Sequence, residues 1–380
     1  MTSGRAAAAL AMGLVFALAA HGATLTVAPG QSLPDALRQA VDGDVIEILA
    51  GVHHGQVGVI DQRHLTLRGV GGRPVLAAAG RDAEGKAILV VRNGDVHIEN
   101  IEFRGARVPD GNGAGIRFEA GRLHVLRCAF IDNQNGILTG NVATAELTVQ
   151  DSEFADAPAS SSLPHLLYVG RIARLTLSGS HFNGGRQGHL VKSRARENHV
   201  LYNRLDDRPD GQASYELEFP NGGMAWVVGN VIAQGSAASN PTLLAFGAEG
   251  SDGRPHGLYL AHNTFINESW KPALFVRVHE KALGAAVLQR VVNNLFVGLG
   301  FADVDWGGGT SGNFFVPSAA LQDSLAAEPR LPADAWLRGR VQAAGSAMGV
   351  SLEPLAEVSA PVGTRRLAPR SSWAAGAFQD

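Results

Sequence analysis

Apolar and polar positions alternate in one short motif that returns along most of the chain. It reads apolar, any, apolar, two of any, a small polar residue, any, then Phe or another large apolar residue. Alternation with a period of two predicts a β-strand with one buried face. The copies are VHIENIEF from 96, LHVLRCAF from 123, LTVQDSEF from 147, LTLSGSHF from 175, HVLYNRL ending at 205, AWVVGNVI from 225, LYLAHNTF from 258, QRVVNNLF from 289 and a degraded SGNFF ending at 315.

The spacing of the copies predicts a solenoid. From position 123, successive copies start at 147, 175, 198, 225, 258 and 289, so the steps are 24, 28, 23, 27, 33 and 31 residues. Such steps lie in the range of solenoid repeats and leave no room for helical crossovers. A second strand-like run follows each copy, as in HLLYVG and HLVKS. We therefore expect an all-β fold, a single-stranded right-handed parallel β-helix of about nine to eleven coils, the count following from the repeat period.

Stacked coils place equivalent residues on top of one another. The motif's last position predicts an inward apolar column, and its small polar position predicts a ladder of hydrogen-bonded side chains. The column comprises Phe103, Phe130, Phe154, Phe182, Leu205, Ile232, Phe265, Phe296 and Phe315. The ladder comprises Cys128, Ser152, Ser180, Asn203, Asn230, Asn263, Asn294 and Asn313.

Both ends of such a β-helix need caps, because open coils expose sheet edges. SLPDALRQAV, from Ser32 to Val41, predicts a short N-terminal capping helix with Leu33, Leu37 and Val41 among the residues of its buried face. The stretch from TLTVAPG to EILAGVH, and the tail SSWAAGAFQ, resemble the two ends of secreted pectate-lyase-like β-helix proteins. We expect a β-helix with its cap over 23–317 and a C-terminal cap or strap over 318–380 that packs on it. The residues predict partial helicity over 318–345 and an extended strap over 346–372.

The first 22 residues have the features of a signal peptide. Arg5 is followed by an uncharged apolar stretch from Ala6 to Ala20, and Ala20-His21-Gly22 offers small residues for cleavage. The stretch is short for a membrane span, and no second run of spanning length follows. We expect a periplasmic or secreted protein without a membrane span in its mature chain.

Composition excludes several classes of function. The 380 residues carry a formal net charge of −3, so no overall basic field favours nucleic acid. A single cysteine, Cys128, excludes an intramolecular disulfide and a cysteine zinc site. Hydrophobic residues make up 45% of the chain and charged residues 18%, which suits a large core. We expect a monomer.

Against this low charge, the stretch GHLVKSRARENHVLYNRL gathers His189, Lys192, Arg194 and Arg196 within eight residues. Stacking of neighbouring coils is expected to bring further charged and imidazole groups alongside on the outer face. These are His165 from the preceding coil, Glu216 and Glu218 from the next, and Glu249 from the one after. One interpretation is a solvated row of opposite charges, and the other is a polysaccharide site.

The same stretch resembles the lysine coil of the chondroitinase B and alginate lyase family. The resemblance implies that Lys192 is the general base of a β-elimination on an acidic polysaccharide. The family's next coil carries an Arg followed by His-Gly, whereas this chain reads LEFPNGG there. Arg194 or Arg196 would then have to supply the missing cation, and His189 is the other candidate base.

Three functions follow from these residues. The first is a polysaccharide lyase with Lys192, His189 and Arg194 as its catalytic residues. The second is a glycoside hydrolase in which Glu218 is the acid. The third is a polysaccharide-binding or cell-envelope protein without catalysis. His165, Arg196, Glu216 and Glu249 are the predicted substrate-binding residues in addition. No cofactor or metal site is predicted, and Ca²⁺ is the one ion that the carboxylates would suit.

Overall fold

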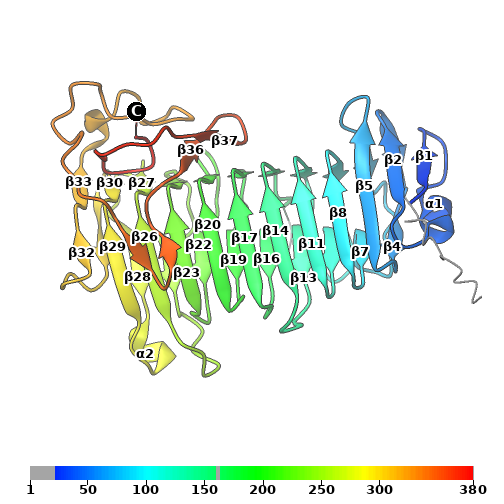
Figure 1. The fold of residues 1–380 in the computed structure, drawn as a ribbon, viewed down its shortest axis with the longest axis horizontal. Helices are drawn as coiled ribbons and strands as arrows, with labels where there is room; N and C mark the ends of the chain where they lie inside the picture. Colours follow the sequence, from blue (N-terminus) through cyan, green and yellow to red (C-terminus); the bar gives the residue numbers. More distant parts are fainter. Residues whose placement is uncertain (1–21, 160–162, 380) are drawn as a thin grey trace, which may run out of the picture.

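The structure is a computed structural model that describes residues 22–159 and 163–379. The predicted signal peptide therefore lies almost entirely outside the described residues. Within them, the chain coils into a parallel β-helix of about 9 turns, as the repeat predicts. Figure 1 shows the coils side by side from the blue N-terminal end to the yellow C-terminal end.

Three parallel sheets, here called A, B and C, form the walls of the β-helix. Each turn contributes one strand to each sheet, and every strand pairs with its equivalent in the next turn. Sheet A comprises β1 (Thr24–Val27), β2 (Val45–Leu49), β5 (His64–Val70), β8 (Asp95–Glu99), β11 (Arg122–Leu126), β14 (Glu146–Gln150), β17 (Arg174–Ser178), β20 (Glu197–Leu201), β23 (Met224–Val228), β26 (Gly257–Ala261), β29 (Leu288–Val292) and β32 (Thr310–Ser311).

Sheets B and C follow sheet A around each turn. Sheet B comprises β3 (Val52–His54), β6 (Val75–Ala77), β9 (Glu102–Arg104), β12 (Ala129–Ile131), β15 (Glu153–Ala155), β18 (His181–Phe182), β21 (Arg204–Asp206), β24 (Val231–Gln234), β27 (Thr264–Asn267), β30 (Leu295–Val297) and β33 (Phe314–Val316). Sheet C comprises β4 (Gly58–Ile60), β7 (Ala87–Val91), β10 (Ala114–Phe118), β13 (Asn135–Thr139), β16 (His165–Val169), β19 (His189–Ser193), β22 (Tyr215–Phe219), β25 (Thr242–Phe246), β28 (Ala273–Val278) and β31 (Gly300–Asp303).

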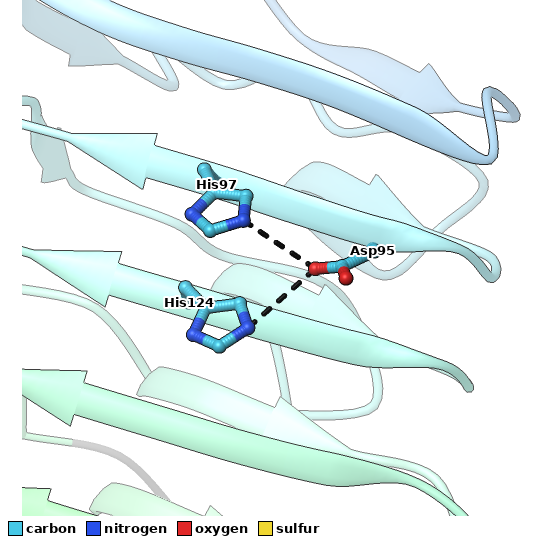
Figure 2. Close-up of side chains that lie close together, drawn as sticks. All are labelled: Asp95, His97 and His124. Carbon is cyan, nitrogen blue, oxygen red and sulfur yellow. Dashed lines mark ion pairs between the residues drawn. The ribbon is translucent and has the colours of Figure 1, made fainter. Parts of the chain in front are cut away.

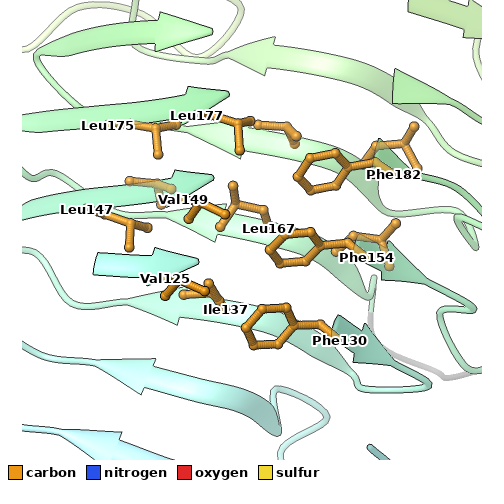
Figure 3. Close-up of a cluster of buried hydrophobic side chains, with 14 of the residues drawn as sticks. Val125, Phe130, Ile137, Leu147, Val149, Phe154, Leu167, Leu175, Leu177 and Phe182 are labelled. Carbon is orange, nitrogen blue, oxygen red and sulfur yellow. The ribbon is translucent and has the colours of Figure 1, made fainter. Parts of the chain in front are cut away.

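The predicted apolar column forms in the interior. The rings of Phe130 and Phe154 stack with centroids 4.6 Å apart, and those of Phe154 and Phe182 with centroids 4.5 Å apart. Figure 3 shows these rings in one file beside the aliphatic residues of sheets A and C. The register continues the column to Phe296, and Phe315 on the last turn stacks on Phe296 but is 47% exposed. The last ring of the column is therefore partly exposed at the C-terminal end.

The polar ladder also forms, through side chains that accept from the backbone of the preceding turn. Asn230 Oδ1 accepts from the Asn203 backbone N–H at 2.8 Å, and Asn263 Oδ1 accepts from that of Asn230 at 3.0 Å. Each Asn also donates to its neighbour's Oδ1, at 3.0 Å in both pairs. These bonds satisfy buried amides at the corner between sheets A and B. The Cys128 backbone N–H joins the ladder through Ser152 Oγ, at 3.1 Å.

The N-terminal end is covered by α1 (Leu33–Gln39), visible at the blue end of Figure 1. Ser32 caps it by accepting from the Asp35 backbone N–H at 3.2 Å. Leu33 and Leu37 are buried in the core cluster. The prediction is wrong for Val41, which is 64% exposed, because the helix ends before it reaches that residue.

Residues 318–379, the C-terminal strap, fold back over the last turns (Figure 1, red). Their apolar side chains cover outward residues of sheets A and B, as with Ala347 on Trp226 and Phe378 near Ile266. The strap holds two antiparallel pairs, β34 (Ser346–Ala347) with β35 (Val350–Ser351) and β36 (Ala356–Val358) with β37 (Thr364–Arg366). The predicted partial helicity of 318–345 is wrong except for the 3₁₀ turn Ser318–Ala320.

The other helix of the described chain is α2 (Glu280–Leu283), which follows β28 of sheet C. No helix in residues 22–159 or 163–379 is long and apolar enough to cross a membrane. The strap packs on sheets A and B, whereas the predicted site residues lie on and beside sheet C.

Candidate active site on sheet C

The outer face of sheet C carries a row of side chains that lie level with one another on successive strands. The register places Tyr168 beside Lys192, and Lys192 beside Glu218. Because parallel strands lie about 4.8 Å apart, residues far apart in sequence become neighbours here. From the N-terminal to the C-terminal coil the row is Val59, Val90, Arg117, Leu138, Tyr168, Lys192, Glu218, Ala245, Arg277 and Asp303.

Lys192 lies at the centre of a network of ion pairs. Its Nζ is 3.2 Å from Glu218 Oε2 and 2.8 Å from Glu249 Oε1. Arg194 contacts the second oxygen of Glu249, with Nη2 2.7 Å from Oε2. The side chains of Lys192 and Arg194 are 11% and 13% exposed, whereas that of Glu249 is 43% exposed. Two largely buried cations therefore converge on one carboxylate that reaches them from the surface.

Two histidines lie beside this network. His189 Nε2 is 2.7 Å from Glu218 Oε2, and the His189 backbone N–H donates to His165 Nδ1 at 2.9 Å. The two rings meet edge to face with centroids 4.7 Å apart. Burial lowers the pKa of His189 and holds the pKa of His165 well below its ordinary value. Both imidazoles are therefore neutral at neutral pH.

The carboxylates of the network are ionised. Burial alone would raise the pKa of Glu218, but its contacts with His189 and Lys192 outweigh burial and lower it. Burial also tends to raise the pKa of Glu249, but its contacts with Lys192 and Arg194 outweigh burial and lower that pKa. Glu218 thus lacks the proton that a hydrolase general acid donates, and these contacts disfavour that role.

Glu216 does not lie on the outer face, and its predicted place in a surface cluster is wrong. The register of β22 sets it level with the core residue Leu190 of β19, and it is 1% exposed. Both carboxyl oxygens are buried without a hydrogen-bond partner among the described residues. Burial and the nearby Asp207 raise its pKa well above the ordinary value. Glu216 and Glu218 therefore do not form a shared calcium site.

Arg196 is also not part of the cluster. It lies beyond the end of β19 in the turn that leads to β20, and it is exposed. Its side chain makes no hydrogen bond or ion pair with any residue that the structure describes. Of the eight predicted site residues, the structure thus gathers six: His165, His189, Lys192, Arg194, Glu218 and Glu249.

Two residues of the cluster escaped the sequence analysis. Tyr168 Oη accepts from Arg194 Nε at 3.1 Å, and Asn221 Oδ1 accepts from Arg194 Nη1 at 2.7 Å. The guanidinium of Arg194 also lies 5.8 Å from the centre of the Tyr168 ring. Alignment of HLLYV with HLVKS sets Tyr168 in the place of Lys192, so the repeat itself held the signal for Tyr168.

The row is hollowed on both sides of the cluster. A hollow of about 340 Å³ lies on its N-terminal side and is lined in part by Arg117, His165 and Tyr168. A second, of about 750 Å³, lies toward the C-terminal coils and is lined in part by Arg277 and Asp303. The ion-pair network therefore separates two depressions, each with an arginine of the same row in its wall.

A hollow of about 840 Å³ on the sheet B side is the main competitor for the site. Burial and Arg204 lower the pKa of His181 there to about 4, and burial raises the pKa of Asp207 to about 6. Asp207, however, accepts from the Gly185 and Ala213 backbone N–H groups at 2.7 and 2.8 Å. These bonds hold the adjoining turns, so we read Asp207 as a structural residue.

Comparison with solved structures agrees with this architecture. A pectate lyase, Pel9A, superposes with a TM-score of 0.60 at 12% identity, over 95% of this chain and 97% of that one. A PL6 family alginate lyase, AlyGC, gives a TM-score of 0.50 at 17% identity, over 77% of this chain and 40% of that one. No protein-family model matches the chain, and no curated protein matches it in sequence.

These likenesses define the class of protein by its fold. The chain has a parallel β-helix fold similar to that of pectate lyase Pel9A. The structural neighbours are polysaccharide lyases, and at these identities they establish the architecture and leave the chemistry to the side chains described above.

Proposed function

We propose that this protein is exported and cleaves an acidic polysaccharide by β-elimination on the outer face of sheet C. One observation carries the proposal: Lys192 and Arg194 bind the two oxygens of the exposed Glu249 carboxylate, at 2.8 and 2.7 Å. A uronate carboxylate has the same charge and geometry. A sugar carboxylate would therefore displace Glu249 and take over both cations.

The spacing of cations supports a polymer that runs across the strands. Arg117, Lys192 and Arg277 belong to one row, and three strand steps separate each from the next. At about 4.8 Å per step, neighbouring cations of the row are roughly 14 Å apart. An extended chain of uronate residues along this row would meet a positive charge at regular intervals, and the two hollows would receive the sugars on either side of Lys192.

The proposed step needs a charge neutraliser and a group that moves a proton. Lys192 has two carboxylates within 3.2 Å, so we assign it, with Arg194, to neutralising the substrate carboxylate and acidifying the C5 proton. The resemblance to alginate lyases instead implies Lys192 as the base. Tyr168 lies between the N-terminal hollow and the cations, and Arg194 donates to its oxygen, a contact that stabilises negative charge there.

In the proposed elimination, Tyr168 takes up one proton and then gives it back. In the proposed step, a Tyr168 phenolate takes the C5 proton, and the C5 electron pair forms the C4–C5 double bond. The C4–O bond breaks, and the departing oxygen takes the proton from Tyr168, which restores the starting state. His189 is the neutral neighbour that positions Glu218 through its 2.7 Å contact.

Binding without catalysis is the second candidate. One observation favours it: the next coil, in which the family that the sequence resembles carries an arginine, reads LEFPNGG here and sets Glu218 beside Lys192. In that case the cation row would hold the polymer and no bond would break.

The test is an ultraviolet assay with alginate, pectate and glycosaminoglycans, because elimination creates an unsaturated product that absorbs. Growth of absorbance, lost in the Tyr168→Phe variant, supports the proposal. Reducing ends without absorbance would assign hydrolysis instead. Polymer retention without either product would leave only the binding function.

A further inference from the structure

Three donor side chains meet on the outer face of sheet A, away from the row on sheet C. His97 and His124 occupy the same position of successive repeat copies, and the register of β8 and β11 sets them side by side. Asp95 lies two residues before His97 on the same strand. Because side chains alternate between the two faces of a strand, both side chains point to the same face. Figure 2 shows both imidazole rings directed at the Asp95 carboxylate.

The distances among the three match the edges of a coordination tetrahedron. Asp95 Oδ1 is 3.4 Å from His97 Nε2 and 3.5 Å from His124 Nε2. Two ligands bound to one tetrahedral zinc at about 2.0–2.1 Å are about 3.4 Å apart. One donor atom from each residue lies within 4.8 Å of the other two. The two rings would have to tilt out of their parallel stack for both nitrogens to face one ion.

Within the part of the chain that the structure describes, the Asp95 carboxylate has a hydrogen-bond partner at one oxygen only. Asp95 Oδ1 is buried without a hydrogen-bond partner among the described residues, while Arg122 Nε lies 3.3 Å from Oδ2. The two rings stack with centroids 4.4 Å apart and an interplanar angle of 7°.

We propose that Asp95, His97 and His124 bind a divalent transition-metal ion of the zinc class, with a fourth position open to water. Two imidazoles and one carboxylate suit zinc and its neighbours, whereas Ca²⁺ prefers an all-oxygen set. Arg122 orients the carboxylate from its far oxygen, as outer partners of metal ligands do. The ion would join β8 to β11 on a wall of the solenoid that the sheet C site does not use.

In all the residues that the structure describes, three such donors converge only here. The sequence held a signal for the pair, because VHIEN and LHVLR place a histidine at the same repeat position. Asp95 completes the set through the D-x-H spacing on one strand. The proposal does not depend on the function of sheet C.

The test uses tag-free protein, since a histidine tag would bind zinc itself. Calorimetric titration with Zn²⁺ is expected to show one site per chain, and Co²⁺ to give the visible absorption of a tetrahedral complex. His97→Ala and His124→Ala should each weaken binding at least about tenfold, in line with the loss of a metal ligand. His199→Ala is the matched control, because His199 lies in the same row of sheet A but stacks on Trp226.

Two further results decide the outcome. Asp95→Asn keeps the shape of the cluster and should also lose affinity, which guards against a histidine variant that fails to fold. Zinc should raise the melting temperature of the parent protein but not of these variants. Equal zinc binding by the parent and all three variants would overturn the proposal, as would absence of uptake by the folded parent or Ca²⁺ binding in preference to Zn²⁺.

Discussion

Lys192 and Glu249 are 57 positions apart in the sequence, and their charged atoms lie 2.8 Å apart. Glu249 comes from the loop that follows β25, two coils beyond Lys192, and closes over the cations from outside. In the absence of substrate, this carboxylate occupies the place proposed for the substrate's own.

Removal of the Glu249 charge should therefore open the site. Glu249→Gln is expected to bind polyuronate about two- to fivefold more tightly, since a partly exposed ion pair is worth up to about 1 kcal/mol. Affinity is measured by calorimetry with defined oligosaccharides. Asp334→Asn, an exposed change in the strap, is the control. Weaker binding by Glu249→Gln would mean that Glu249 itself holds the sugar.

The roles of Tyr168 and Lys192 separate in steady-state kinetics. Tyr168→Phe should lower kcat about 10²–10⁴-fold with little change in KM, because it removes the proton-transferring oxygen and keeps the ring. Lys192→Ala should raise KM as well, since substrate loses a cation. A Lys192→Ala variant with an unchanged KM and a kcat loss of that size would assign the base to Lys192 instead.

Glu216 should make stability fall as pH rises. Its folded-state pKa is raised, so the folded state holds a proton that the unfolded chain releases above its ordinary pKa of 4.5. Stability is lost as pH rises from there toward the folded pKa. Glu216→Leu places an apolar side chain between Leu190 and Leu243 of the neighbouring coils. It should raise the free energy of unfolding by about 1–3 kcal/mol at neutral pH.

This gain should be larger at pH 8 than at pH 5, as read from thermal melts at both values. Glu218→Gln is the contrasting variant on the same strand. It should destabilise, because Lys192 would lose a partner and His189 its charged neighbour. A gain from Glu216→Leu that does not change with pH would mean that Glu216 is already ionised in the fold.

The polar ladder should contribute strongly where it is buried. Asn230→Ala removes bonds to Asn203, Asn263 and Val200 at a fully buried site, with an expected cost of about 2–4 kcal/mol. Asn313→Ala, at the half-exposed last rung, should cost less. Urea unfolding measures both. Equal costs would show that burial does not set the strength of a rung.

If the protein is exported, the signal peptide should be absent from the mature chain. The protein recovered from the periplasm or medium of a Gram-negative host should begin near residues 21–24, because Ala20 and Gly22 offer small residues at the two positions that a signal peptidase reads. Mass spectrometry of the intact protein measures this. Recovery of protein with Met1 from the cytoplasm alone would contradict it.

The sequence by itself determined the features that repeat. Phe130, Phe154 and Phe182 share one column because a fixed position in each turn has a fixed direction, and Asn203 and Asn230 share a ladder for the same reason. The place of Glu218 beside Lys192 also followed from register. His97 with His124, and Tyr168 with Lys192, were readable in the same way but were not recognised.

Tertiary structure alone decided what departs from the repeat. Glu216 turns inward because β22 begins beside the core position of Leu190, so strict alternation does not hold at that strand end. Asn221 reaches Arg194 from a loop of irregular length, and the strap covers sheets A and B through contacts across more than a hundred positions. A repeat specifies direction and register for its own positions, whereas loops and the strap are placed by packing against the finished coils.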